Sequence, residues 1–247
     1  MLLSWIITFS ILGSIGAIIA AAAFLLTKEN VQKILVPTLI SYATGTLLAA
    51  ALLGLLRKSL QHISSLQVMS ALLIGIIFFF SLEKLLIWRH CHNMECERHG
   101  IAGPMILVGD VFHNLTDGIV IAASFLASIP IGMVTSLSVI AHEIPQEVGD
   151  FAILLHGGYS RRRAFSLNML SSISTLPGAI IAYYALDIAN YATPYVMAFS
   201  AASFLYIALA DLVPELHGKM GFKHSIQQFI LMMAGVGTII LILYGHF

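Results

Sequence analysis

Long apolar runs are the feature of this sequence that most restricts its fold. Stretches of 20 or so mostly apolar residues follow one another along the chain, and only short polar segments separate them. A bilayer core about 30 Å thick is crossed by about 20 residues of α-helix. With 59% hydrophobic and 10% charged residues, the composition excludes an ordinary soluble domain and a disordered chain. The sequence therefore predicts an integral, multi-pass membrane protein.

We expect an all-α bundle of eight transmembrane helices that forms a single polytopic membrane domain over residues 1–247. The predicted spans are residues 2–26, 34–56, 66–88, 101–128, 131–155, 164–186, 195–216 and 225–244. Four prolines lie at or beside predicted helix starts, where a missing backbone N–H costs little: Pro37, Pro104, Pro130 and Pro194. Pro145 and Pro177 lie inside predicted spans, so a kink is expected at each.

Lysine and arginine are distributed unequally between alternate loops. Most of them follow the first, third, fifth and seventh predicted spans: Lys28, Lys33, Arg89, Arg98, Arg161, Arg162, Arg163, Lys219 and Lys223. Only Arg57 and Lys58 lie in a loop on the other side. Because such residues concentrate in cytoplasmic loops, both termini are predicted outside the cytosol, in a plasma or inner cell membrane. A cleaved signal peptide is the alternative for the first span, disfavoured because no positive charge precedes the apolar run.

A polar loop over about residues 89–100 holds both cysteines of the chain. It reads "RHCHNMECERHG" and contains His90, Cys91, His92, Cys96 and His99. Two cysteines on the predicted cytoplasmic side are expected to be thiols rather than a disulfide framework. Imidazole and thiolate together suit zinc, although the spacing matches no closed four-ligand module. A metal-capturing loop and a solvated connector are therefore equal alternatives.

Polar residues are concentrated in the fourth and fifth predicted spans. In the fourth, one helical face carries Asp110, His113, Asn114 and Asp117, which are three, four or seven residues apart. In the fifth, one turn separates two polar residues and an acidic stripe adjoins them: His142, Gln146, Glu143, Glu147 and Asp150. The connection near Ser128 is so short that the two helices must be antiparallel neighbours. The two stripes are therefore expected to face each other.

Facing histidines and carboxylates inside a membrane predict a cation site. A single buried histidine is more often a hydrogen-bonded core residue, but polar groups in a span are costly and usually line a pathway. Imidazole nitrogen and carboxylate oxygen suit zinc, and iron(II), manganese and cadmium accept the same ligands. The two facing stripes supply several such nitrogen and oxygen ligands, enough for two neighbouring ions, and Asn114 can add a neutral oxygen. Zinc or another divalent cation is thus predicted as the transported substrate rather than as a resident cofactor.

Two motifs carry a resemblance to a known family. "HNLTDG" from His113 and "HEIPQEVGD" from His142 resemble the fourth- and fifth-helix signatures of the ZIP family of metal transporters, particularly its LIV-1-like branch. "FSLEKLL", "LPGAI" and "FLYIALADLVPEL" resemble further parts of the family, so the resemblance covers nearly the whole chain. It implies uptake of zinc or a related divalent ion towards the cytosol through helices four and five.

The resemblance also implies a distribution of ligands. His113, Asp117, His142 and the residue at 146 would line a first metal position, and a second would be formed by Asn114, Glu143 and Glu147. This chain departs from the LIV-1-like pattern at one ligand, because Gln146 stands where histidine is usual. A glutamine oxygen is a weaker, uncharged ligand, which makes metal affinity and ion choice the properties most affected.

Two other function classes are alternatives to a metal transporter. An intramembrane metalloprotease is suggested by the near match of residues 142–146 to H-E-x-x-H, but Gln146 replaces the second zinc ligand and Pro145 distorts the turn. A proton-coupled carrier of another solute would also use histidine and carboxylate relays. The expected function is therefore transport and not enzymatic catalysis. The expected partners are divalent metal ions and the lipid bilayer, with no nucleic acid, and a homodimer remains open.

Overall fold

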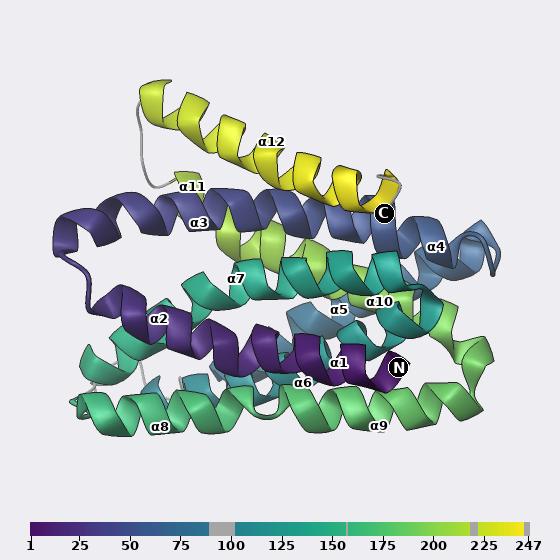
Figure 1. The fold of residues 1–247 in the computed structure, drawn as a ribbon, viewed down its shortest axis with the longest axis horizontal. Helices are drawn as coiled ribbons and strands as arrows, with labels where there is room; N and C mark the ends of the chain where they lie inside the picture. The colour runs from purple at the N-terminus through teal and green to yellow at the C-terminus, as the bar shows by residue number, and fades with distance from the viewer. Residues whose placement is uncertain (89–101, 157, 218–221, 245–247) are drawn as a thin grey trace.

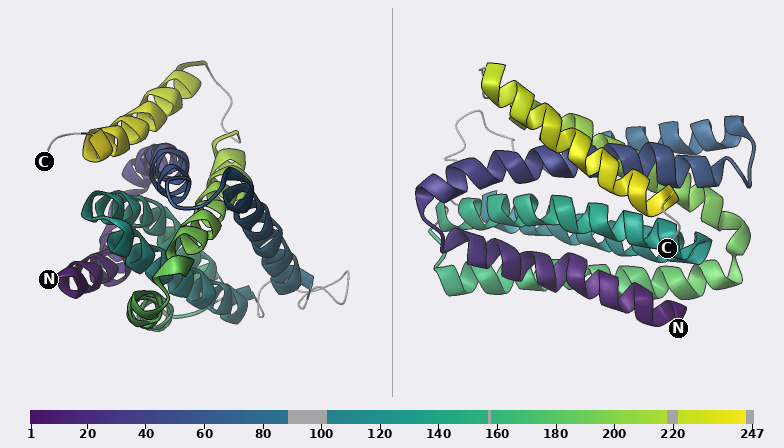
Figure 2. Two further views of the ribbon diagram at one scale, coloured as in Figure 1. Left: turned by 90° about the vertical axis from the view of Figure 1, so that its right-hand side faces the viewer. Right: turned by 45° about the horizontal axis from the view of Figure 1, so that its top comes forward.

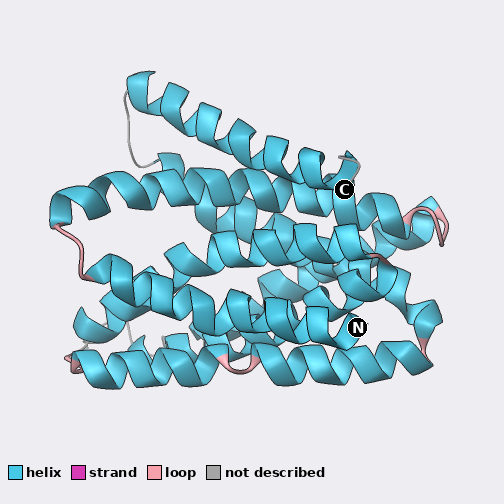
Figure 3. Ribbon diagram, viewed as in Figure 1, coloured by secondary structure: helices cyan, strands magenta, loops and turns pink. Residues whose placement is uncertain are grey.

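Helical segments cover the described residues of all the predicted spans, although a turn divides the sixth into two helices. The computed structural model describes residues 1–88, 102–156, 158–217 and 222–244, and regular structure within these ranges is entirely helical (Figure 3). The first half contains α1 (Leu2–Ile11), η1 (Leu12–Gly16), α2 (Ala17–Leu25), α3 (Glu29–Ala49), η2 (Ala50–Leu56), α4 (Arg57–Ser59), α5 (Ser65–Trp88) and α6 (Ala102–Ala127). The second half contains α7 (Ile129–His156), α8 (Arg161–Ser172), α9 (Thr175–Ile188), η3 (Asn190–Ala192), α10 (Thr193–Tyr206), η4 (Ile207–Leu212), α11 (Val213–His217) and α12 (Phe222–Tyr244). The polar loop predicted over residues 89–100 lies outside the described residues.

Six helical segments in the described ranges are long and apolar enough to cross a membrane. They are Leu2–Phe24, Leu35–Ser59, Ser65–Leu82, Arg161–Leu186, Asn190–Leu212 and His224–Tyr244. These segments support an all-helical, multi-pass membrane protein. Two further long helices, α6 and α7, are not among these six segments because of their polar stripes, which carry His113 and His142 together with Asp110, Asp117, Glu143, Glu147 and Asp150.

The α6–α7 pair is surrounded by other helices. α7 packs against α2 and α3 as well as α6, while α6 packs against α8, α9 and α10. α12 lies against α3, and α5 lies against α10, towards the periphery of the bundle (Figure 2). The start of α1 and the end of α12 lie at one end of the bundle, the end at which α6 turns into α7 (Figure 1). The polar stripes of α6 and α7 are thus held inside the protein.

Close contact between α6 and α9 depends on glycine. A Cβ atom added to Gly118 would lie 2.0 Å from the Thr175 carbonyl oxygen, and one added to Gly178 would lie 2.3 Å from the Leu115 carbonyl oxygen. Both distances are far below a van der Waals contact, so no larger residue fits without separating the helices. Small residues of this kind are typical of membrane helix interfaces, where dispersion contacts replace the hydrophobic effect.

Two of the prolines inside the described helices lie differently from the expectation. Pro37 lies inside α3 rather than at a helix start, because the helix begins eight residues earlier at Glu29. Pro177 lies in the first turn of α9, because the predicted sixth span is interrupted by a turn at Ile173 and Ser174. Pro145 lies inside α7 as expected, although the helix is continuous around it.

The α8 helix begins with a side-chain cap. Ser160 has extended backbone angles, and its hydroxyl accepts a hydrogen bond from the backbone N–H of Arg163. A serine in this position satisfies one of the free N–H groups of the first helical turn. The cap fixes the entry of α8, whose buried face then carries Ser172 towards Glu147 of α7.

Candidate metal centre

Four predicted ligands meet between α6 and α7. His113 and Asp117 come from α6, His142 and Glu143 come from α7, and one nitrogen or oxygen from each lies within 4.8 Å of the others. The side chains of Asp117, His142 and Glu143 are at most 1% exposed, whereas that of His113 is 18% exposed. We call these four residues the histidine cluster. It is buried except on the side of His113.

The separations between the ligand atoms are short and similar. The Nε2 atoms of His113 and His142 lie 3.1 Å apart. His113 Nε2 lies 3.2 Å from Glu143 Oε1, and His142 Nε2 lies 3.2 Å from Asp117 Oδ2. The remaining histidine–carboxylate separations are 3.8 Å between His113 and Asp117 and 3.7 Å between His142 and Glu143. All four ligand atoms therefore converge on one small volume.

The ring of His142 is held by the backbone of its own helix. Its Nδ1 lies 2.9 Å from the carbonyl oxygen of Ser138, one turn earlier. A carbonyl can only accept, so this bond favours the tautomer with hydrogen on Nδ1, which leaves the Nε2 lone pair directed at the cluster. The Ser138 hydroxyl donates to the Thr46 carbonyl on α3, and Phe204 on α10 packs edge-on against the imidazole. Neighbouring helices thus fix the ligand orientation.

A second polar group adjoins the histidine cluster. Asp110 Oδ1 accepts a hydrogen bond from Asn114 Nδ2 at 2.9 Å and another from Gln146 Nε2 at 3.4 Å. The Thr175 hydroxyl on α9 donates to Asn114 Oδ1 at 2.8 Å. The Asn114 side chain is thus engaged at both of its polar atoms. Its amide holds one oxygen of Asp110 in place.

Glu147 lies in the same region and is held from α8. The Ser172 hydroxyl donates to Glu147 Oε1, and the Glu147 side chain is buried. Ser172 and Thr175 therefore contact the polar residues of α7 and α6. The sequence did not predict these two contacts, because serine and threonine are common in membrane helices. Asp110 was visible in the α6 stripe but was not among the expected ligands.

The seven predicted ligands fall into two groups. Four of them form the histidine cluster, in which Glu143 accompanies His113, Asp117 and His142. Asn114, Gln146 and Glu147 instead lie in the adjoining hydrogen-bonded group. The amide nitrogen of Gln146 faces Asp110. The hydrogen bond from Gln146 to the Asp110 carboxylate therefore links the polar stripe of α7 to that of α6.

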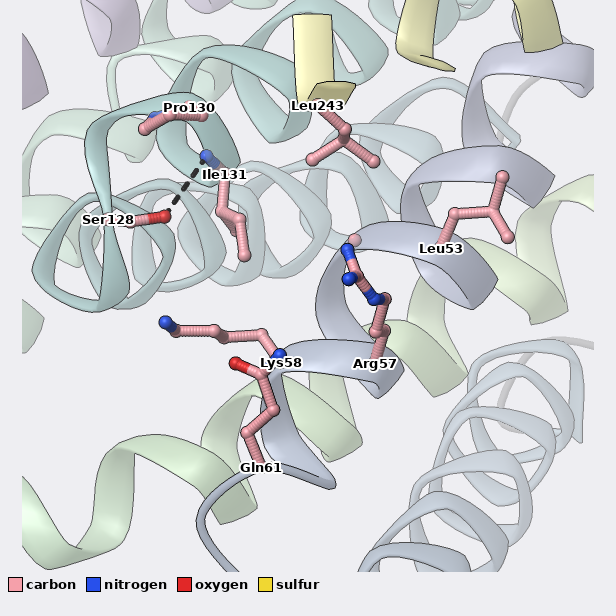
Figure 4. Close-up of a pocket in the computed structure, with 9 residues that line it drawn as sticks. Leu53, Arg57, Lys58, Gln61, Ser128, Pro130, Ile131 and Leu243 are labelled. Atoms are coloured by element: carbon pink, nitrogen blue, oxygen red, sulfur yellow. Dashed lines mark hydrogen bonds between the residues drawn. The ribbon is translucent and has the colours of Figure 1, made fainter.

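A separate pocket of about 200 Å³ lies at the end of the bundle where α6 turns into α7 (Figure 4). It is lined by Leu53, Gly54, Arg57, Lys58, Gln61, Ser128, Pro130, Ile131 and Leu243. Its lining contains two basic side chains and neither histidine nor carboxylate. This lining does not suit a metal cation, so the pocket is distinct in chemistry from the histidine cluster.

Comparison with known proteins shows which protein family the chain resembles. A family profile described as "ZIP Zinc transporter" matches residues 88–243, which include α6 to α10 and both polar stripes. The matched region contains every residue of the histidine cluster and of the adjoining group.

Several curated proteins are similar to the chain. Zinc transporter ZIP13 of Pongo abelii is 33% identical over 224 residues, which cover 85% of this chain and 66% of the relative. Zinc transporter zipt-7.2 of Caenorhabditis elegans is 36% identical over 140 residues, covering 55% of this chain and 30% of the relative. Zinc transporter ZIP10 of Homo sapiens is 39% identical over 155 residues, covering 59% of this chain and 18% of the relative. The chain thus matches less than two thirds of the length of each relative.

Proposed function

Because this chain belongs to the ZIP family of zinc transporters, we propose that it carries divalent metal cations, zinc foremost, across a membrane towards the cytosol. The similarity to ZIP13 and ZIP10 also confirms the expected relation to the LIV-1-like branch. The cation would bind in the histidine cluster between α6 and α7 during transport.

The separations in the histidine cluster are the observation that carries this proposal. Zinc binds histidine nitrogen and carboxylate oxygen at about 2.0–2.2 Å, so two ligands of a tetrahedral ion lie about 3.3–3.6 Å apart. The five separations given above run from 3.1 to 3.8 Å and bracket that range. One ion at the centre of the cluster would require shifts of only a few tenths of an ångström.

The charges of the cluster also suit a divalent cation. Asp117 and Glu143 supply two negative charges, and neutral imidazoles add none. Carboxylates buried in an apolar protein interior are costly unless a positive charge accompanies them. A divalent cation with both carboxylates and both neutral histidines is neutral overall, so the protein interior can hold it.

We place α6 and α7 among the membrane-crossing helices, which gives eight spans. Their polar stripes face inward and are covered by neighbouring helices, so the cost of polar residues in the membrane is reduced. Both termini are proposed to lie outside the cytosol, following the loop charges. In this orientation the start of α6 and the end of α7 face the cytosol.

Transport requires that the cluster be reached from each side in turn. Sites near the middle of the membrane are generally exposed by movement of one part of a transporter against another. We propose that the α6–α7 pair, with its cluster, moves against the surrounding helices. The partial exposure of His113 marks the side on which the cluster opens in the present conformation.

Position 146 is proposed to tune ion choice. Gln146 provides an amide oxygen in place of an imidazole, and oxygen ligands favour harder cations such as manganese more than nitrogen does. Iron(II), manganese and cadmium are therefore proposed as competing substrates. Asn114 and Glu147 remain candidate ligands of a neighbouring ion.

The test is uptake by the purified chain in lipid vesicles. We expect saturable uptake of zinc, with competition by cadmium, iron(II) and manganese added singly. Vesicles that contain a His113→Ala, His142→Ala double variant at equal protein content are the matched control. Absence of saturable uptake for every divalent ion would contradict the proposal.

A further inference from the structure

The pocket at the turn between α6 and α7 holds the two basic residues that depart from the loop charge distribution. In the loops at this end of the bundle, lysine and arginine occur only at positions 57 and 58, and both side chains line the pocket. We propose that the pocket binds the phosphate group of an anionic membrane phospholipid, in the leaflet at this end of the bundle. The proposal is independent of transport, because it uses no residue of the histidine cluster or of the group that adjoins it.

The pocket brings together three parts of the chain that are far apart in sequence. Leu53, Arg57 and Lys58 come from η2 and α4, Ser128 lies in the turn before α7, and Leu243 lies near the end of α12. Figure 4 shows the two basic side chains reaching from the η2–α4 segment into the space bordered by Ser128 and Leu243. A bound anion would therefore contact three separate helical segments at once.

The two positive charges have no counter-charge in the structure. Within the described ranges, neither Arg57 nor Lys58 forms an ion pair, and the pocket lining holds no carboxylate. The Arg57 guanidinium lies 5.0 Å from the centre of the Tyr244 ring. This stacking uses the flat face of the guanidinium and leaves the N–H groups along its edge available, in a geometry that matches phosphate oxygens. An anion would balance the charge that the two residues concentrate here.

The first turn of α7 adds to the attraction for an anion. The helix begins at Ile129, and its next two residues, Pro130 and Ile131, line the pocket. The start of a helix carries the positive end of the helix dipole, which favours phosphate groups. The Gln61 side chain also lines the pocket and offers an amide donor. Phosphate oxygens, which only accept hydrogen bonds, suit this set of donors.

The position of the pocket favours a lipid over a free phosphate. Tyr244 ends the apolar segment His224–Tyr244, and tyrosine at the end of such a segment typically lies at the level of the lipid headgroups. Ile240, one turn before Leu243 and Tyr244, is 40% exposed and extends the apolar surface of α12 towards the middle of the membrane. Acyl chains attached to a phosphate in the pocket would lie along this surface.

The size of the pocket agrees with a headgroup. Its volume of about 200 Å³ is below the roughly 300–1,000 Å³ of sites that enclose drug-sized ligands. A phosphate with part of its glycerol is smaller than such ligands, and the acyl chains remain outside among the other lipids. Basic pockets between transmembrane helices are known to recognise lipid headgroups in this way.

The test uses the purified full chain in detergent, with phosphatidylglycerol, phosphatidylcholine or inorganic phosphate added at one concentration. We expect one phosphatidylglycerol per chain in mass spectrometry of the intact complex, and a rise in the thermal unfolding midpoint, because the ligand binds only the folded chain. Phosphatidylcholine carries a cation that offsets its phosphate, and inorganic phosphate lacks acyl chains. Each should therefore raise the midpoint less.

Two pocket variants and one control locate the binding. Arg57→Gln, Lys58→Gln removes both charges and should weaken phosphatidylglycerol binding by more than about tenfold. Ser128→Leu keeps both charges but fills the pocket, so it should weaken binding too and serves if the double variant fails to fold. The matched control is Arg161→Gln, Arg162→Gln, which removes two exposed charges at the start of α8, at the opposite end of the bundle.

Four outcomes would overturn the proposal. Wild-type binding of phosphatidylglycerol in both pocket variants would exclude the pocket, and equal loss in the control would attribute binding to overall charge. An equal midpoint rise with phosphatidylcholine would exclude an anionic ligand. An equal rise with inorganic phosphate would exclude a lipid. None of these results depends on zinc uptake, so the proposed function is tested separately.

Discussion

The Nε2 atoms of His113 and His142 lie 3.1 Å apart across the α6–α7 interface. Two imidazoles this close cannot both be positively charged without strong repulsion, so the pair is suited to share a cation through its lone pairs. The Ser138 carbonyl already directs the His142 lone pair towards this point. The two rings are therefore expected to act as one unit in metal binding.

Loss of either histidine should accordingly cost nearly as much as loss of both. His113→Ala and His142→Ala are each expected to weaken zinc binding by more than about 100-fold, the upper range for loss of an outer partner of a ligand. The double variant should be only slightly worse than either single variant. Calorimetric titration of the three purified variants checks this, and effects that simply add would mean that the histidines do not share an ion.

Asp117→Ala should nearly abolish transport of every divalent ion. Asp117 is fully buried, and its Oδ2 lies 3.2 Å from His142 Nε2. Removal of its charge leaves an incoming cation uncompensated in an apolar interior. Uptake of zinc, manganese and cadmium should be measured at matched surface abundance, with Thr116→Val as the control for a change on α6. Normal uptake by Asp117→Ala would exclude the histidine cluster as the transport site.

Gly118→Ala should destabilise the protein through the α6–α9 contact. The added methyl group would meet the Thr175 carbonyl oxygen at 2.0 Å, so the helices must separate at a cost of about 1–3 kcal/mol. Gly237→Ala is the control, because nothing lies within 4 Å of a Cβ atom at that position. Thermal unfolding of both variants in detergent should give a lower midpoint for Gly118→Ala only. Equal midpoints would show that the α6–α9 spacing is not fixed by this glycine.

The orientation can be tested with the native thiols. Cys91 and Cys96 belong to the predicted cytosolic loop, so an impermeant thiol reagent should label them only after cells are permeabilised. A Cys91→Ser, Cys96→Ser chain carrying Ser128→Cys is the opposite control, since Ser128 lies in the turn between α6 and α7. Labelling of the native thiols in intact cells would reverse the proposed orientation.

Apolar length and polar periodicity were enough to predict most of this fold. The four members of the histidine cluster were all expected from the sequence, because charged residues are rare inside apolar helices and usually line an ion pathway. The turn at Ile173 and Ser174 was not expected, because the segment Arg161–Leu186 is long and apolar enough as a whole to be one span and no glycine lies at the turn. Its prediction would have required knowledge of how α9 packs against Gly118.

The direction of the side chains was less predictable than their helical face. Residues 142 and 146 share a face of α7, yet His142 enters the histidine cluster and Gln146 faces Asp110. Sequence spacing gives the face, but hydrogen-bond donors and acceptors on the opposite helix decide the rotamer. The Gln146 amide donates to Asp110, whereas His142 Nε2 lies beside Asp117 and His113 one turn away.

Gln146→His should therefore change ion preference. A histidine at this position would place a third imidazole one turn from His142. The ion would then have more nitrogen ligands relative to oxygen ligands, which favours zinc over manganese. The substitution also removes the donor that Gln146 offers to Asp110, so Gln146→Ala is the matched control for that loss. Competition between zinc and manganese in vesicles should shift towards zinc by about tenfold in Gln146→His and not in Gln146→Ala. If both variants keep the wild-type preference, the side chain at 146 does not contact the transported ion, and selectivity depends on the histidine cluster alone.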